Sequence, residues 1–174
     1  MDYEIVGAKG KFEDVEGVID RLKNLGEKYN VTLQLIDARL IFGKAHLDSA
    51  VFHAQRAMAK STNLAKSIAV EIILYASGER QIGQAITKMG IKSDTEEFGL
   101  IIYDLPSQGA SEEGSKLCGD ILSELDLVRD DTILEGDKSV LERFGITKEE
   151  LEAVSQSHWS NLILERVAMV DIIK

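Results

Sequence analysis

The run Glu71-Ile-Ile-Leu-Tyr-Ala-Ser-Gly-Glu-Arg-Gln-Ile82 predicts the end of one helix and the start of another. Its first part is apolar and stops at Gly78, because glycine adopts the left-handed backbone of a helix end at little cost. After a polar turn, apolar residues return at helical spacing until Gly90. We therefore expect a helix from Leu64 to Ser77 with Asn63 as its N-cap, then a helix striped by Ile82, Ala85, Ile86 and Met89.

Further helices and strands are predicted on both sides of this run. Strands are expected at Tyr3–Val6, Val31–Ile36 and Phe98–Tyr103, from β-branched content, alternation or a short apolar run. Upstream helices are expected at Glu13–Tyr29 and along a stripe of Leu47, Ala50, Val51, Ala54 and Met58. Downstream helices are expected at Ser111–Leu125, Lys138–Phe144, Thr147–Ser155 and Trp159–Ile173. The short segment Gly7–Lys11 lacks the pattern of a phosphate-binding loop and is expected to form a turn.

This order of elements predicts an α+β fold in which helices cover a small, mostly antiparallel sheet. One proline, Pro106, and no Ser/Gly-rich linker leave no obvious domain boundary, so residues 1–174 are expected to form a single domain. A chain of 174 residues buries roughly 70% of the surface that its unfolded form exposes, which suffices for a sizeable core.

The composition is that of a soluble globular protein, with 44% hydrophobic and 29% charged residues. The apolar run from Leu162 to Ile173 is interrupted by charges and is too short to span a membrane. The first residues lack the basic and apolar regions of a signal peptide. Cys118 is the single cysteine, so no internal disulfide forms, and a cytoplasmic location is expected.

Positive charge is concentrated in one segment of an otherwise acidic chain. Residues 43–92, the basic segment, carry seven Lys/Arg and three Asp/Glu, a local net charge of +4 within a chain of −10. A polyanion would be repelled by the chain as a whole, so the basic segment is the candidate surface for a nucleic acid. Residues 93–174, with seven basic and 19 acidic residues, would keep RNA away from that part of the chain.

Helical spacing gives the basic segment a predicted shape. His53, Arg56 and Lys60 fall on one face of their helix, away from the apolar stripe, and Gln81, Gln84 and Lys88 do the same in theirs. Helix N-termini near Asn63 and near Glu79-Arg80 would add N–H donors suited to phosphate. The functional interpretation is a groove for a nucleic-acid backbone; the alternative is three solvated helices whose charges maintain solubility.

The sequence of residues 71–82 resembles the signature of one family: the tRNA-recruiting, kinase-binding accessory subunit of the KEOPS complex, related to the eukaryotic PRPK-binding protein. The upstream Gly43-Lys-Ala-His-Leu-Asp-Ser-Ala50, the alanine-rich helix ending at Lys60 and the strand at Phe98–Tyr103 are similar as well. The resemblance covers nearly the whole chain, and its specific part lies between Gly43 and Ile82.

The resemblance implies a noncatalytic role in making N6-threonylcarbamoyladenosine (t6A) in tRNA. Family members bind and activate a small atypical kinase/ATPase subunit, contact other KEOPS subunits indirectly, and hold tRNA partly through its 3′ CCA end. A single-stranded end requires cations, amides and apolar surface. The residues expected to supply these groups are Arg56, Lys60, Asn63, Lys66, Arg80, Gln81 and Gln84. The alternative for Arg80 and Gln81 is a role at the helix start, with Glu79 or Gln81 near the first-turn donors.

The last predicted helix is apolar on more than one side. Ile163, Val167 and Val170 form one row, and Leu164, Ala168 and Ile172 form another. The first face is expected to pack on the sheet. The second, with Ile173, is expected to bind the kinase, so Leu164, Ala168, Ile172 and Ile173 are the candidate kinase-binding residues. The equally weighted alternative is a helix buried within the domain on both faces.

Patterns of catalytic or metal-binding residues are not found in the sequence. His46 and His53 are seven residues apart without a third ligand at suitable spacing, so surface or capping roles are expected rather than a metal site. Cys118 has no identifiable base nearby and is expected to be a small buried hydrophobe. No cofactor is predicted. Two rival functions remain open: a protein-interaction module without RNA binding, and a small enzyme with an unrecognised site.

Overall fold

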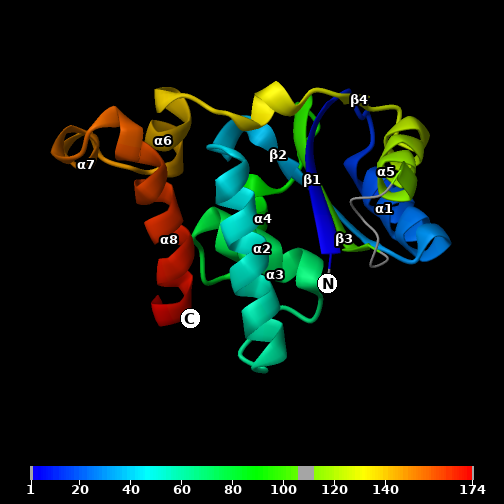
Figure 1. Cartoon of the computed structure of the whole chain (residues 1–174), viewed down its shortest axis with the longest axis horizontal. Coiled ribbons are helices and arrows are strands. Elements are labelled where there is room, and N and C mark those ends of the chain that lie inside the picture. The colour runs from blue at the N-terminus through cyan, green and yellow to red at the C-terminus, as the bar shows by residue number, and fades with distance from the viewer. Residues whose placement is uncertain (1, 106–111, 174) are drawn as a thin grey trace. The chain divides into compact units, whose positions relative to one another are not determined.

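The structure is a computed structural model that describes residues 2–105 and 112–173. The chain forms two compact units (Figure 1). The sheet unit comprises Met1–Ala38 and Ile91–Ile133, and the helical unit comprises Arg39–Gly90 and Leu134–Lys174, apart from the positions outside the described residues. Pro106 lies outside the described residues. The α+β prediction is confirmed, whereas the single domain over residues 1–174 stays a prediction.

The sheet unit is built on four antiparallel strands in the order β2-β3-β1-β4. These are β1 (Asp2–Lys9), β2 (Thr32–Asp37), β3 (Glu97–Leu105) and β4 (Val128–Arg129). The three predicted strands are confirmed: β1 and β3 are longer than predicted, and β2 has the predicted length but begins one residue later. The short β4 was not predicted, because two residues carry no periodicity and its place is set by pairing with Ala8 and Lys9 of β1.

The predicted turn at Gly7–Lys11 is wrong, because β1 continues through Gly7 to Lys9. Gly7 pairs with Gly99 of β3, and its carbonyl accepts a hydrogen bond of 2.9 Å from the Asp130 N–H. A Cβ atom on Gly7 would lie 2.3 Å from the Asp130 carbonyl oxygen. Glycine is therefore required here for the close approach of a second backbone, and not for a turn.

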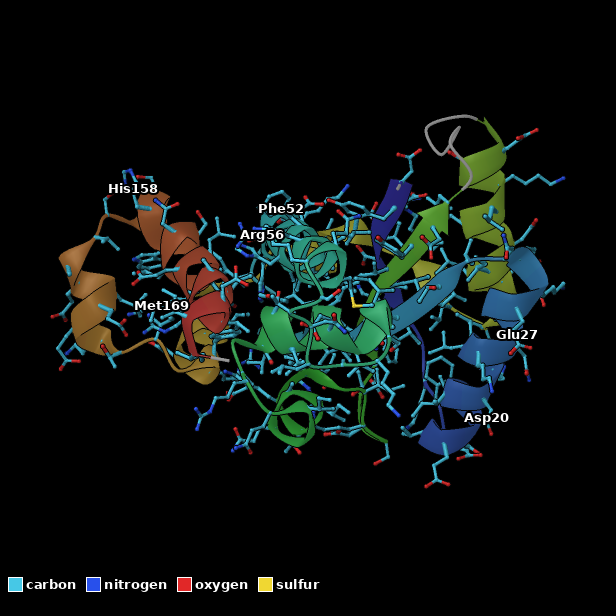
Figure 2. The ribbon with its side chains drawn as sticks, turned by 90° about the horizontal axis from the view of Figure 1, so that it is seen from below. Asp20, Glu27, Phe52, Arg56, His158 and Met169 are labelled. Carbon is cyan, nitrogen blue, oxygen red and sulfur yellow. The ribbon has the colours of Figure 1, made fainter. Side chains whose placement is uncertain are left out.

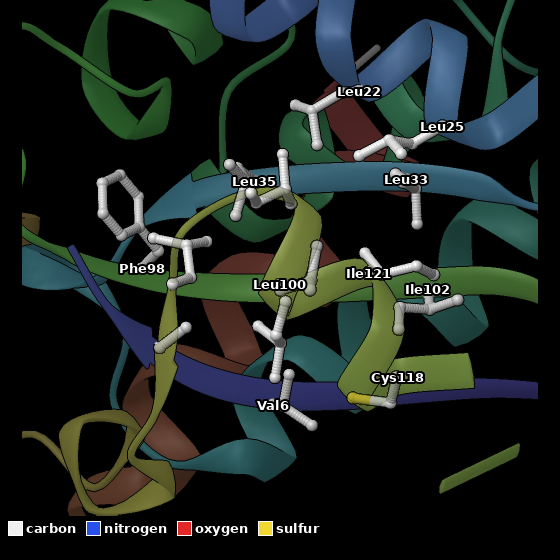
Figure 3. Close-up of a cluster of buried hydrophobic side chains, with 14 of the residues drawn as sticks. Val6, Leu22, Leu25, Leu33, Leu35, Phe98, Leu100, Ile102, Cys118 and Ile121 are labelled. Carbon is white, nitrogen blue, oxygen red and sulfur yellow. The ribbon is translucent and has the colours of Figure 1, made fainter. Parts of the chain in front are cut away.

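Two helices cover one face of the sheet: α1 (Val15–Tyr29) and α5 (Glu112–Glu124) (Figure 1). Figure 3 shows side chains of α1 and α5 facing side chains of the strands, including Leu22 and Leu25 from α1 and Ile121 from α5. Cys118 of α5 belongs to this core and is 1% exposed, as expected of a small hydrophobe. Burial raises the pKa of the Cys118 thiol to about 11, so the thiol is protonated at neutral pH.

The helical unit contains six α-helices among its described residues: α2 (Lys44–Ala59), α3 (Ile68–Ser77), α4 (Ile82–Met89), α6 (Lys138–Phe144), α7 (Lys148–Ala153) and α8 (Trp159–Ile173). Helix α3 lies at its centre, in contact with α2, α4 and α8. The described bounds of α4, α6 and α8 agree with the predicted ones. Short 3-10 turns at Ala38–Leu40, Asp131–Leu134 and Gln156–His158 complete the described elements of the chain.

The predicted start of the central helix is wrong. Helix α3 begins at Ile68 with Ser67 as its N-cap, four residues later than the predicted start, and Asn63 instead donates a side-chain hydrogen bond to the Ala65 carbonyl. The reason is Glu71, a fully buried residue whose carboxylate accepts the N–H groups of Leu64 and Ala65, at 3.0 and 2.8 Å. These two N–H groups are thereby held in a loop in front of the helix.

Candidate functional site

All eleven residues predicted to bind tRNA or kinase lie in the helical unit. Six of the seven polar ones lie at the two ends of α3, and the seventh, Arg56, lies within α2. Lys60, Asn63 and Lys66 precede its N-terminus, while Arg80, Gln81 and Gln84 follow its C-terminus. A helix of ten residues is about 15 Å long, and Glu71 to Ser77 are all buried. The structure therefore places these predicted residues in two polar groups at opposite ends of a buried helix, and not in one cluster.

The first polar group is on the loop between α2 and α3. Lys60 is the C-terminal cap of α2 and is exposed, as is Lys66, which comes just before the N-cap Ser67. Neither lysine forms an ion pair within the described part of the chain. The buried Glu71 carboxylate fixes the loop between the two lysines by accepting the N–H groups of Leu64 and Ala65. Lys60 and Lys66 therefore flank a backbone segment that is held in place by hydrogen bonds.

The second polar group surrounds the turn between α3 and α4. Gly78 ends α3 with φ +69°, as predicted, and Arg80, Gln81 and Gln84 are exposed. Gln81 is the N-cap residue of α4 but its side chain forms no capping hydrogen bond, so the structure gives no support to its alternative role at the helix start. Arg80 has no ion-pair partner among residues 2–105 and 112–173.

The apolar stripe predicted for α4 is only half buried. Ala85 and Met89 are buried, whereas Ile82 and Ile86 are 37% and 47% exposed. These two isoleucines are on the same helix as Gln81 and Gln84. The N-terminal end of α4 therefore offers both amides and apolar surface to solvent.

Lys88 does not lie on the exposed face predicted for it. Its Nζ donates a 2.8 Å hydrogen bond to the Ser77 carbonyl at the end of α3 and lies 3.2 Å from a Glu79 carboxylate oxygen. The same Nζ is 4.0 Å from the centroid of the Phe144 ring. A cation at these positions stabilises the C-terminal end of α3, so Lys88 supports the turn that carries Arg80.

His46 also binds the C-terminal end of α3. It is fully buried, its Nδ1 accepts the Phe42 N–H at 3.3 Å, and its Nε2 donates to the Ala76 carbonyl at 2.7 Å. Burial lowers the pKa of His46 to about 4, and the charge of Lys88 adds to the effect. His46 therefore has the capping role that was one of its two predicted roles, and it is neutral at pH 7.

The face predicted for His53, Arg56 and Lys60 is not uniformly exposed. The His53 side chain is only 13% exposed and stacks on the Tyr75 ring, with ring centroids 5.4 Å apart. Both His53 and Arg56 are bound to the carboxylate of Asp171 in α8. Arg56 and Lys60 keep the predicted exposed position, whereas His53 does not. Arg56, a candidate tRNA-binding residue, has its charge engaged by an internal ion pair.

The two apolar rows of α8 are clearly separated in the structure. Ile163, Val167 and Val170 are fully buried. This row packs in the helical unit, where α8 contacts α2 and α3, so the predicted packing on the sheet is corrected to packing on helices. In the other row Leu164 is half-buried and Ala168 is exposed. Ile172 and Ile173 are 75% and 39% exposed, which contradicts the alternative of a helix buried on both faces.

Phe52 is an exposed residue that the sequence interpretation missed. Its side chain is 57% exposed, and the Arg56 guanidinium carbon is 5.8 Å from the ring centroid. Figure 2 shows the two residues side by side on α2, and Met169 on α8. The signal was present, because Phe52 falls outside the stripe formed by Leu47, Ala50, Val51, Ala54 and Met58.

Metal and membrane sites are not found in the described part of the chain. Among these residues no group of three His, Cys, Asp or Glu side chains is placed to hold a metal ion. No described helix combines the length and apolar character needed to cross a bilayer.

A comparison with protein-family models matches residues 12–171 to the family described as kinase binding protein CGI-121. The match spans most of the chain and includes both polar groups and residues 159–171 of α8, but not Ile172 and Ile173. A search of curated proteins finds no match.

Proposed function

The chain belongs to the CGI-121 kinase-binding protein family. From this premise we propose that it is the noncatalytic KEOPS subunit that binds and activates the small atypical kinase/ATPase. We propose further that it recruits tRNA, including the 3′ CCA end, for t6A modification in the cytoplasm. Contact with other KEOPS subunits is indirect in this proposal, and the chain itself needs no cofactor. The family match supports the kinase partner; the RNA role is supported by the resemblance of residues 43–82 and by the charges described above.

The observation that carries the kinase part of the proposal is the exposed row of α8. Ala168, Ile172 and Ile173 are exposed and Leu164 is half-buried, on a helix whose other row, Ile163, Val167 and Val170, is fully buried and holds the helix in place. An exposed isoleucine such as Ile172, ordered before binding, contributes apolar area at low entropic cost when a partner covers it. We assign this row to the kinase.

The kinase surface is tested by Ile172→Glu, with Ile19→Glu as the matched control. Ile19 is an isoleucine on an exposed helix face of the sheet unit, 56% exposed against 75% for Ile172. Calorimetric titration with the purified kinase subunit should show a loss of at least about tenfold in affinity for Ile172→Glu and none for Ile19→Glu. Equal affinities for both variants would reject the assignment of this row.

The tRNA part of the proposal rests on Lys60, Asn63 and Lys66 before α3 and on Arg80, Gln81 and Gln84 after it. Lys60, Lys66 and Arg80 are exposed and form no ion pair with another described residue, so their charges are available for phosphates. Gln81 and Gln84 provide amides beside the exposed Ile82 and Ile86. Arg56 was included in the predicted set, but its pairing with Asp171 makes it the weakest member.

Filter binding tests the RNA role with Lys60→Glu combined with Arg80→Glu. The matched control is Lys23→Glu combined with Lys116→Glu, two exposed lysines of the sheet unit that make the same change in net charge. We expect only the first pair to weaken binding of tRNA, and we expect removal of CCA to weaken wild-type binding. Affinity should also fall steeply with salt, because phosphate contacts release counterions. Equal tRNA affinities for the two double variants would refute this surface.

The same measurements separate the rival functions. A protein-interaction module without RNA binding predicts kinase affinity but no dependence on CCA and no difference between the two charge-reversed variants. A small enzyme predicts substrate turnover by the isolated chain. Co-purification of the chain with a small atypical kinase would give the most direct support, because it tests the shared premise.

A further inference from the structure

Asp171 is surrounded by polar side chains at the very end of α8. One carboxylate oxygen, Oδ1, accepts a 2.5 Å hydrogen bond from the Tyr75 hydroxyl, and the other, Oδ2, lies 2.8 Å from Nδ1 of His53 and is also bonded to Arg56. His53 and Arg56 come from α2, and Tyr75 comes from α3. We call this four-residue cluster the Asp171 clamp. It joins three helices of the helical unit at one carboxylate.

Helix stability alone gives no reason for an acid at this position. The C-terminal end of a helix carries partial negative charge, so an aspartate in the last turn is unfavourable, and the last turn of α8 contains no basic residue. The cost is offset by the clamp. Burial raises the pKa of Asp171, but the hydrogen bonds from Tyr75, His53 and Arg56 outweigh this effect and hold its pKa below the usual value, so the group is ionised at pH 7.

The partners of Asp171 are themselves held in place. The His53 ring stacks on Tyr75 and meets the Phe52 ring edge-on at 5.6 Å, while Arg56 lies over Phe52 (Figure 2). Tyr75 is fully buried. The clamp therefore connects the last turn of α8 to the buried Tyr75 on one side and to the exposed Arg56, which packs on Phe52, on the other.

The residues that directly follow Asp171 are Ile172 and Ile173, two exposed residues of the proposed kinase surface. The last turn of a helix normally frays, because its carbonyl groups lack partners within the helix. Side chains on a fraying turn lose more freedom when a partner binds, which lowers affinity. The Asp171 clamp opposes fraying of the last turn of α8, so that Ile172 and Ile173 lose less freedom when a partner binds.

We propose that Asp171 is a positioning residue for the kinase, acting through Arg56, His53 and Tyr75 to hold Ile172 and Ile173 in their binding arrangement. This inference rests on the proposed kinase-binding role of the chain. It assigns Arg56 to the support of the kinase surface and not to the binding of RNA.

The test is a double-mutant cycle on kinase affinity with Asp171→Asn and Arg56→Gln. Each single variant should weaken kinase binding about tenfold, which is about 1.4 kcal/mol, and the double variant should lose little more than either one. The control is Glu142→Gln, which breaks an exposed ion pair to Lys138 in the same unit and should leave kinase affinity unchanged. Additive losses would show that Asp171 and Arg56 act independently, and would overturn the proposal.

Amide hydrogen exchange supplies a readout that global destabilisation would not reproduce. Exchange should accelerate in Asp171→Asn at the last turn of α8, residues 169–173, while the amides of α3 keep their protection. If Asp171→Asn fails to fold, Tyr75→Phe removes a single donor from the clamp and should give the same pattern at smaller amplitude, with roughly a threefold loss in affinity.

The possible failures are distinguishable. A wild-type chain that does not bind the kinase overturns the proposed function together with this inference. Normal kinase affinity in Asp171→Asn overturns only the inference. A loss of tRNA affinity in Arg56→Gln without any change in kinase affinity would likewise overturn it, and would return Arg56 to the RNA surface.

Discussion

Lowering the pH from 7 to 5 should destabilise this protein through a single buried side chain, His46. Burial, aided by the charge of Lys88, lowers the pKa of His46 from 6.5 to about 4, although the hydrogen bond to the Ala76 carbonyl opposes the shift. In the unfolded chain the imidazole takes up a proton below about pH 6.5, whereas in the folded chain it stays neutral until about pH 4. The unfolded state therefore binds more protons between these two values, and stability falls as the pH falls.

The magnitude follows from the width of this window. At 1.36 kcal/mol per pH unit, His46 should remove about 2 kcal/mol of stability between pH 7 and pH 5. Urea unfolding at the two pH values measures the loss directly, with the slope m as a check that the two-state description holds at both. His46→Gln keeps an amide that can reach the same carbonyl but cannot titrate. The variant is expected to be less stable at pH 7 and to lose about 2 kcal/mol less on acidification.

His53 and His158 are present in both proteins, so their contributions cancel in this comparison. An equal loss of stability in His46→Gln and the wild type between pH 7 and pH 5 would refute the reasoning. It would mean that the proton is taken up elsewhere.

Three further substitutions are expected to lower stability for separate reasons, each measured by thermal or urea unfolding. Glu71→Gln should cost about 2 kcal/mol, because the N–H groups of Leu64 and Ala65 both donate to the same carboxylate oxygen, Oε2, and a neutral amide oxygen accepts each bond more weakly than a charged one; a change below about 0.5 kcal/mol would contradict the loop geometry. Gly78→Ala should cost about 1 to 2 kcal/mol, because φ is +69° at this helix end; a more stable alanine variant would be inconsistent with that conformation. Thr147→Ala should cost about 1 kcal/mol through the loss of the capping box with Glu150, and an unchanged midpoint would count against it.

Elements with their own periodicity and end signals were predictable from the sequence. The described bounds of α6 and α8 agree with the predicted ranges, and the predicted strands were placed correctly because each has enough residues to show a pattern. The start of α3 was not predictable in this way. It depends on the side chain of Glu71, which captures N–H groups six and seven positions earlier, and local propensity carries no sign of that contact.

The candidate site was only partly predictable, for a related reason. The sequence identifies which residues are charged, but not which charges are already engaged. Arg56 meets Asp171 across 115 positions of the chain, and Lys88 is engaged by Glu79 and the Ser77 carbonyl. The residue-level assignments to tRNA and kinase therefore stay predictions. The exposure of Phe52 was the one site feature that helical spacing alone should have identified.

The sheet topology has a consequence for how the chain folds. β2 and β3 are antiparallel neighbours, with Asp37 paired to Phe98, yet residues 38–96 separate the two strands, where a hairpin would need only a few residues. Closing a disordered loop of this length costs about 2 kcal/mol more than closing a loop of four residues. Helices α2 to α4 are made of local contacts, which form faster than pairings between distant strands. We therefore expect these helices to form before β2 and β3 pair, so that the pairing of β2 with β3, and not helix formation, limits how quickly the sheet is completed.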